Sequence, residues 1–310
     1  MAYTNRDDIN YLGALYQIGA NQTPFLNMIG GLNGGKTSPS FDFAITQPWV
    51  LRAADQASNV MSEATSVSTT TEDTVTRSQE INTCQIMKYS YGVSFAKKST
   101  MAEIGGIAVA GINPPVMDEL AFQKMAALKQ MAVDVEFSFL QGAYVAQNIN
   151  TTVAKTQGIL AACAATSTVD AGSAALSKAY IKALLLEMVA NGAQFQNMVL
   201  FCNGYQKQAL SDLYGYAPES INVGGVNIES IYTDFAKIGV VYAPYMPTDD
   251  ILIADLSVCS PVFCPVDGRI IVDQEVATTT AKQGGFLYTQ IGLDYGPKEF
   301  HGTLTSLKDS

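Results

Sequence analysis

The chain has 310 residues, of which 48% are hydrophobic and only 15% are charged, and its net charge is −10. Its length allows one large domain or two average ones, and its apolar content excludes a disordered tail, because such chains combine high charge with few apolar residues. The acidic balance argues against a protein that reads duplex DNA, since affinity for phosphate comes from clustered Lys and Arg.

The first two expected regions have little core of their own. Residues 1–40 are expected to form an extended arm, because short apolar pieces alternate there with Gly, Asn and Pro. Residues 41–95 are expected to form a long hairpin, in which apolar residues alternate with polar or small ones on either side of a tip at 62–78. The tip is rich in Thr, Ser and acidic residues, and a two-stranded ribbon of this length is marginally stable alone. The pattern therefore indicates a partner chain on which the hairpin packs.

Residues 96–149 contain the clearest helical pattern of the chain, at 116–141. Pro115 precedes this segment, and Asp118 suits the positive N-terminal end of a helix. At 1.5 Å per residue such a helix is ~40 Å long, which is unusual in a compact globular protein. Its expected packed stripe, mostly in steps of four residues, consists of Leu120, Lys124, Leu128, Ala132, Val135 and Phe139.

Residues 150–265 are expected to form a separate α/β lobe, and residues 266–310 are expected to return as strands to the region of the long helix. Short apolar runs bounded by Gly, Pro and Asp indicate strands, and apolar stripes at helical spacing indicate helices. Helices are expected at 174–191 and 206–214, and strands at 198–202, 226–235, 238–242, 251–254, 269–273, 286–293 and 303–307.

One short motif favours an enzyme. Gly30, Gly35, Lys36 and Thr37 fit G-x-x-x-x-G-K-[ST], the loop that cradles nucleotide phosphates, and the strand ending in Asp255 could present a carboxylate to magnesium. A P-loop needs a strand before it and a helix after it, so that the helix N-terminus faces phosphate. Strand alternation and an early proline follow this loop instead. A nucleotide-binding enzyme built on Gly30 to Thr37 is therefore an alternative hypothesis, beside a flexible glycine loop.

Other catalytic or metal-binding groups are hard to assemble from this sequence. His301 is the single histidine, so any Ser-His-Asp or Cys-His group would have to use it. The five cysteines include no Cys-x-x-Cys pair, whereas zinc sites need several Cys or His ligands at short spacing. Each cysteine is expected to be a small buried hydrophobe of a reduced protein. No catalytic, cofactor-binding or metal-binding residue is predicted, and no run of about 18 apolar residues indicates a membrane span.

Several short stretches, dispersed over most of the chain, carry a resemblance to a known family. They are 82–86, Val93, Ser94, Gly105, Glu136, 140–142, 282–285, Gly292, Leu293, His301, Gly302 and Leu304. These stretches and the order of the regions are similar to the major capsid proteins of tailed bacteriophages, which have the Hong Kong 97-type fold. The resemblance implies an α+β fold with an N-terminal arm (1–40), an extended loop or E-loop (41–95), a P-domain (96–149) with a spine helix (116–141), an α/β A-domain (150–265) and return strands of the P-domain (266–310).

The resemblance implies a structural protein without catalysis. Such a protein assembles with itself, through hexamers and pentamers, into an icosahedral shell around double-stranded DNA. It is part of the virion capsid and is assembled in the cytoplasm of the host bacterium. The low charge would then reflect apolar surface buried between subunits, and the acidic balance would leave DNA held only by weak, non-specific contacts. An encapsulin-like nanocompartment shell, which has the same fold, is a further alternative.

The resemblance also bears on partners and cross-links. No long charged helical segment precedes the arm, so the expectation is either a separate scaffolding protein or a chain that was trimmed before this sequence. A portal is also expected, and decoration proteins are a further possible partner. Some members of the family join their subunits by a covalent Lys–Asn cross-link. The hairpin tip at 55–78 contains no lysine, so no such cross-link is expected here. A decoration or tail-tube protein is disfavoured, since those are mostly β and this chain has a long helix.

Overall fold

The structure is a computed structural model that describes residues 22–45, 60–68, 79–96, 119–146, 152–163, 166–214, 220–223, 226–276 and 280–309. Its helices are α1 (Pro24–Met28), α2 (Glu63–Ser66), α4 (Glu119–Gln141), α5 (Ile159–Cys163), α6 (Lys178–Ala190), α7 (Gly204–Tyr214) and the 3-10 helix η1 (Lys298–Phe300). Its strands are β1 (Lys36–Thr37), β2 (Asp42–Ala44), β3 (Ile81–Thr83), β4 (Gln85–Ser94), β5 (Thr168–Asp170), β6 (Met198–Cys202), β7 (Ser220–Val223), β8 (Val226–Tyr232), β9 (Lys237–Tyr242), β10 (Ile251–Asp255), β11 (Ser260–Phe263), β12 (Ile271–Val276), β13 (Lys282–Asp294) and β14 (Gly302–Thr305).

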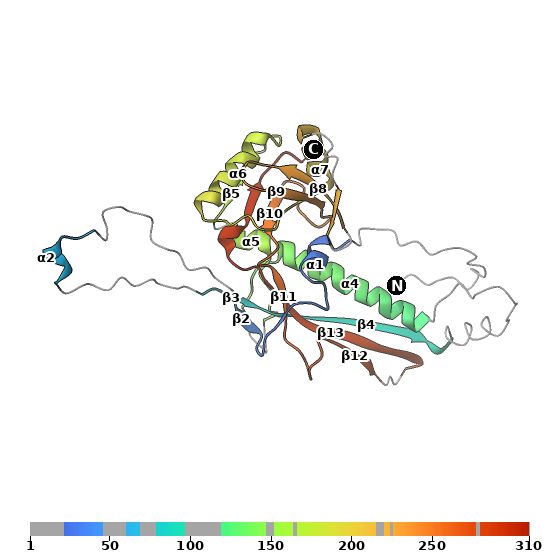
Figure 1. Cartoon of the computed structure of the whole chain (residues 1–310). Coiled ribbons are helices and arrows are strands. Elements are labelled where there is room, and N and C mark those ends of the chain that lie inside the picture. Colours follow the sequence, from blue (N-terminus) through green and yellow to red (C-terminus); the bar gives the residue numbers. More distant parts are fainter. Residues whose placement is uncertain are drawn as a thin grey trace.

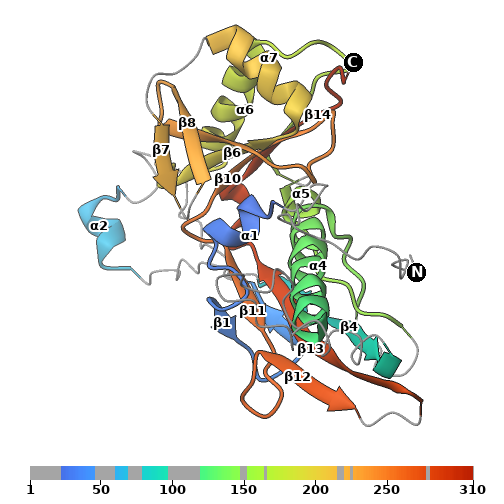
Figure 2. The same cartoon turned by 90° about the vertical axis from the view of Figure 1, so that its right-hand side faces the viewer.

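These elements form a lower lobe and an upper lobe, and α2 lies far from both of them (Figure 1). Residues 46–59 and 69–78 of the expected hairpin lie outside the described residues. The lower lobe is a sheet covered on one face by α4, and the upper lobe is a sheet with helices on both faces (Figure 2). None of the described helices is long and apolar enough to cross a membrane. The mixture of sheets and helices confirms the α+β fold class.

The lower sheet is organised around β13. β4 pairs antiparallel with one edge of β13, while β12 and then β11 pair antiparallel with the other edge. β1 joins the free side of β11 in parallel. Side chains alternate along a strand, and those of Leu287, Ile291 and Leu293 are buried in the core that α4 covers. The opposite face of β4 and β13 carries no helix among the described residues (Figure 2).

The upper sheet has the strand order β5-β14-β10-β6-β9-β8-β7 and separates two apolar clusters. All five residues of β6 are buried, which explains the continuous apolar run at 198–202. Val199 and Phe201 face α1 and α5, whereas Leu200 faces α6 and α7. The rings of Phe25 and Phe201 meet edge to face, with centroids 5.4 Å apart, so α1 lies directly beneath this sheet.

Three strands pair differently from the sequence expectation. β4, expected as the return side of the hairpin, pairs with β13, and the hairpin pairing among the described residues is that of β2 with β3. β11, expected in the α/β lobe, joins the lower sheet. β14, expected among the return strands of the lower lobe, pairs with β10 and β5 in the upper sheet. Periodicity identifies a strand and its buried face, but long-range contacts decide which strand it pairs with.

The described part of the expected arm does not extend away from the lobes. α1 begins at Pro24, whose fixed φ suits the first turn of a helix, and Phe25 and Leu26 are buried. The Glu136 carboxylate in α4 accepts hydrogen bonds from the backbone N–H groups of Phe25 (2.9 Å) and Leu26 (2.6 Å). These groups have no acceptor within a helix, so the carboxylate satisfies them. Burial raises the pKa of Glu136 to about 7, although these two hydrogen bonds act to lower it.

The packed face of α4 agrees with the expected stripe in part. Its buried residues are Met131, Val135, Glu136, Phe139 and Leu140. Leu128 is 39% exposed, and Lys124 forms an ion pair with Asp273 of β12 instead of packing in the core. Leu120 and Ala132 pack against the same core as Val135 and Phe139, so the expected stripe is correct at these four positions and wrong at Lys124 and Leu128.

Two aspartate substitutions on α4 test this assignment of its packed face. Leu128→Asp should leave the free energy of unfolding of the free subunit within about 1 kcal/mol of wild type, because the side chain reaches water. Met131→Asp should abolish soluble, folded protein, because an unpaired carboxylate would be buried. Soluble yield and urea denaturation measure both effects. An insoluble Leu128→Asp variant would mean that the packed face includes position 128.

Glu136 should make the stability of the free subunit depend on pH. Its pKa is raised from the ordinary 4.5 to about 7 on folding, so its contribution is fully present below pH 4.5 and is lost as the pH rises through about 7. Glu136→Gln removes this titration. Between pH 4.5 and about 7, the free energy of unfolding of wild type should fall by about 3 kcal/mol relative to that of the variant. Urea denaturation measures this difference. A difference that stays constant with pH would contradict a buried carboxylate that binds a proton.

Candidate functional site

The hairpin tip lies far from both lobes and exposes several apolar side chains. Val60, Met61 and Val67 are 76%, 51% and 85% exposed, and α2 between them is capped by the hydroxyl of Ser62. Ile81, at the base of the hairpin, is exposed as well. Single exposed apolar residues are ordinary, but several gathered on a segment with little core of its own mark a contact surface. The candidate site is therefore a surface that packs against another chain.

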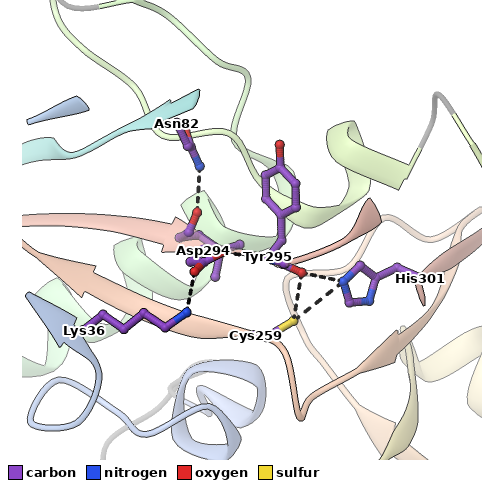
Figure 3. Close-up of polar contacts among 8 residues, drawn as sticks. Lys36, Asn82, Cys259, Asp294, Tyr295 and His301 are labelled. Carbon is purple, nitrogen blue, oxygen red and sulfur yellow. Dashed lines mark hydrogen bonds and ion pairs between the residues drawn. The ribbon is translucent and has the colours of Figure 1, made fainter. Parts of the chain in front are cut away.

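Asn82 fixes the hairpin where it leaves the lower lobe (Figure 3). Its side-chain amide donates to the carbonyl oxygens of Leu293 (2.8 Å) and Gln157 (3.2 Å). Its oxygen accepts from the backbone N–H groups of Thr83 (2.9 Å) and Gln157 (2.8 Å). The residue is completely buried, and both donors and both acceptor positions of the amide are used. β3 is thereby attached to β13 and to the segment that precedes α5.

Glu80 also holds the base of the hairpin in place. Its carboxylate forms an ion pair with Lys298 of η1. The hydroxyl of Tyr295 lies 3.2 Å from Glu80 Oε2 and 3.2 Å from Gln157 Oε1, so its single proton is shared between two acceptors. Burial and the nearby Glu80 carboxylate raise the pKa of Tyr295, which keeps the hydroxyl protonated as a donor. Sequence patterns did not indicate these contacts, which join residues more than 130 positions apart.

His301 supports Tyr295 from the side of the upper lobe. Its Nε2 donates to the Tyr295 carbonyl oxygen (2.6 Å), and its Nδ1 accepts from the Asp255 backbone N–H (3.2 Å). Burial lowers the pKa of His301 to about 4, so the ring is neutral near pH 7. The Cys259 sulfur lies 4.0 Å from Nε2, but burial raises the pKa of this thiol well above its usual value. A nucleophilic cysteine needs the opposite shift, so this Cys–His contact is structural.

The loop from Gly30 to Thr37 does not have the geometry of a P-loop. A helix, α1, precedes it, and Lys36 and Thr37 form β1, which reverses the required order of strand, loop and helix. The Lys36 ammonium binds the buried Asp294 carboxylate at 2.6 Å (Figure 3). Gly35 has a φ of 135°, and a Cβ there would lie 2.4 Å from the Pro261 carbonyl oxygen. The glycine thus allows β1 to approach β11, and the motif is a spacing coincidence.

The remaining expected residues also have structural contacts. The Asp255 carboxylate accepts the N–H and the hydroxyl of Ser257, so it caps the turn after β10. All five cysteines are free thiols, of which four are buried and Cys264 is half-buried. In the part of the chain that the structure describes, no three His, Cys, Asp or Glu residues are arranged to hold a metal ion.

Lys36→Ala tests the ion pair and the P-loop together. The substitution should lower the free energy of unfolding by about 1–3 kcal/mol, because the Asp294 side chain, which is only 2% exposed, loses the Lys36 ammonium. Magnesium ATP should leave the melting temperature of wild type unchanged, whereas a bound nucleotide would raise it. Thermal melts with and without the nucleotide measure both effects. A rise in wild type that disappears in Lys36→Ala would restore the P-loop hypothesis.

Comparisons with known proteins cover the whole chain. The model of the SU10 major capsid protein family matches residues 1–308, whereas no curated protein matches the chain. A capsid chain of cyanophage A-1(L) is 13% identical, with a TM-score of 0.64 and 96% of each chain covered. A chain of Mycobacterium phage Bobi is 12% identical, with a TM-score of 0.55 and 100% of this chain and 96% of that chain covered. The SrpI encapsulin of Synechococcus elongatus is 11% identical, with a TM-score of 0.60 and 99% and 96% covered. At these identities the structures show the fold alone, but the family match extends over both lobes and the hairpin, and the chain belongs to the SU10 major capsid protein family.

Proposed function

We propose that this major capsid protein assembles with copies of itself, through hexamers and pentamers, into an icosahedral shell around the double-stranded DNA of a tailed bacteriophage. The observation that carries the proposal is the family match over residues 1–308. The shell is the capsid of the virion and is assembled in the cytoplasm of the host bacterium. In this proposal the lower lobe with α4 is the P-domain with its spine helix, the upper lobe is the A-domain, and residues 1–40 and 41–95 are the arm and the E-loop.

The exposed apolar tip of the hairpin supports contacts between subunits. A contact between two different patches on identical copies forms a closed ring when its rotation closes. Val60, Met61 and Val67 supply an apolar patch that lies away from both lobes of its own subunit (Figure 1). We infer that this tip packs on a neighbouring copy, where the burial of apolar surface stabilises the ring.

The other partners follow from the charge and from the family. Packaged DNA makes only weak, non-specific contacts in this proposal, because a charge of −10 per subunit opposes tight binding to phosphate. A separate scaffolding protein and a portal take part in assembly in this proposal. No catalytic step is proposed, since Lys36 is engaged by Asp294 and the thiol of Cys259 is not activated.

A shell that holds protein cargo instead of DNA is the second candidate. This candidate rests on the fold alone, which the chain shares with the SrpI encapsulin over 99% of its length. Negative-stain electron microscopy of the purified protein, expressed with and without its assembly genes, tests both candidates. Closed shells or rings support assembly, and the nucleic acid or protein content of the shells separates a phage capsid from a cargo compartment. A monomer that never assembles under either condition would contradict both.

Replacement of residues 55–78 by a short Gly-Ser linker should leave a folded subunit that forms no closed shells. The two lobes keep their cores, but the apolar tip is lost. Thermal melting checks the fold, and electron microscopy checks assembly. A variant with serine at Val60, Met61 and Val67 keeps the full length and should assemble poorly for the same reason. Normal shells from both variants would contradict the role of the tip.

A further inference from the structure

We propose that Tyr295 is a positioning residue that couples the direction of the hairpin to the orientation of the upper lobe. The two ends of this one residue contact different parts of the molecule. Its hydroxyl contacts the base of the hairpin through Glu80. Its carbonyl oxygen contacts His301, which directly precedes β14 (Figure 3). This assignment rests on the proposed function only where it concerns assembly.

The hydroxyl end is a polar junction that several elements share. Glu80 directly precedes β3, Lys298 belongs to η1, and Gln157 precedes α5. Since the Glu80 carboxylate receives both the Lys298 ammonium and the Tyr295 hydroxyl, a rotation of the hairpin about its base breaks both contacts. The Glu80 carbonyl oxygen also accepts from the N–H of Ile45 (2.8 Å), which ties the two sides of the hairpin together at this point.

The carbonyl end is held by buried groups of the upper lobe. His301 Nε2 donates to it at 2.6 Å, and the Cys259 thiol lies 3.8 Å away. His301 is fixed in turn by the backbone N–H of Asp255, the last residue of β10 in the upper sheet. Because Tyr295 and His301 are both completely buried, neither can exchange these partners for water.

The position of Tyr295 in the chain makes the coupling direct. It follows Asp294, the last residue of β13, whose carboxylate binds Lys36 of β1. It precedes Gly296, whose φ is 66° and where a Cβ would lie 2.8 Å from the Val258 side chain. Consecutive residues at the end of β13 therefore contact the segment after α1, the hairpin and the upper lobe. Because these residues are adjacent in the chain, none of the three parts can shift without affecting the contacts of the others.

A small rotation at this base has a large effect at the tip. Because α2 lies far from both lobes, a rotation at the base changes the direction in which the tip meets a neighbouring copy (Figure 1). In a shell, the tip and the upper lobe must both meet neighbouring copies, so their relative direction determines whether the rings close with one curvature.

The test measures this direction in the free subunit, before any assembly. Spin labels are placed at Ala44→Cys on β2 and Lys182→Cys on α6, both at exposed positions, in a Cys264→Ser background. Tyr295→Phe removes only the hydroxyl. Tyr288→Phe is the matched control, because it removes a hydroxyl of β13 that accepts from Gln290 (2.7 Å) away from the junction. Lys298→Met removes the ion pair with Glu80 and changes a partly exposed position. This variant is used in place of Tyr295→Phe if Tyr295→Phe does not fold.

Pulsed electron resonance should give one narrow distance distribution for wild type and for Tyr288→Phe, and a distribution at least twice as wide for Tyr295→Phe or Lys298→Met. The melting temperature should fall by only about 2–4 °C. In the assembly assay the same variants should give open or irregular particles where wild type gives uniform shells. An unchanged distribution in the variants, or an equally wide one in wild type, overturns the proposal. If the widths change but wild type forms no shells, the coupling stands and the proposed function fails.

Discussion

The hydrogen-bond ladder along β13 is the constraint on which the rest of the molecule depends. β13 has 13 residues and is paired on both edges, with β4 on one side and with β12 and β11 on the other. This close approach requires residues without side chains, because a Cβ at Gly284 would lie 2.4 Å from the Tyr91 carbonyl oxygen and one at Gly292 would lie 2.7 Å from the Phe43 ring. α4 packs on one face of β13. The residues at the C-terminal end of β13 contact the segment after α1, the hairpin and the upper lobe.

Buried polar groups, more than apolar packing, decide how these parts are oriented. Asn82, Glu136 and His301 are all completely buried, and each spans two elements that are far apart in sequence. Apolar contacts are non-directional, so a lobe packed only by them would tolerate several orientations. A buried amide or carboxylate is different, because every misplaced partner leaves an unsatisfied group at a free-energy penalty of about 1–3 kcal/mol. These residues therefore specify one arrangement, whatever their net effect on stability.

The sequence predicted the local elements well and their partners poorly. The expected strand at 198–202 coincides with β6, and the long helix at 116–141 agrees with α4 as far as the described residues extend, because strong periodicity identifies elements of this kind. The pairing of β4, β11 and β14 depends on contacts made only in the folded chain. The same holds for the exposure of Leu128, because by helical geometry it lies on the same side of α4 as the buried Val135 and Phe139. The junction of Glu80, Tyr295 and Lys298 leaves no pattern at all in the sequence, since its members have no common spacing.

The composition and the architecture together explain how an acidic subunit can associate with itself. A charge of −10 on every copy produces repulsion, but that repulsion is screened over about 8 Å at physiological ionic strength. The attraction between apolar surfaces acts only at contact and requires surfaces with few charges. A charged fraction of 15% leaves room for such surfaces, and the hairpin presents one at a distance from the bulk of the subunit. The geometry at the base of the hairpin thus decides whether the attraction acts in the direction that closes a shell.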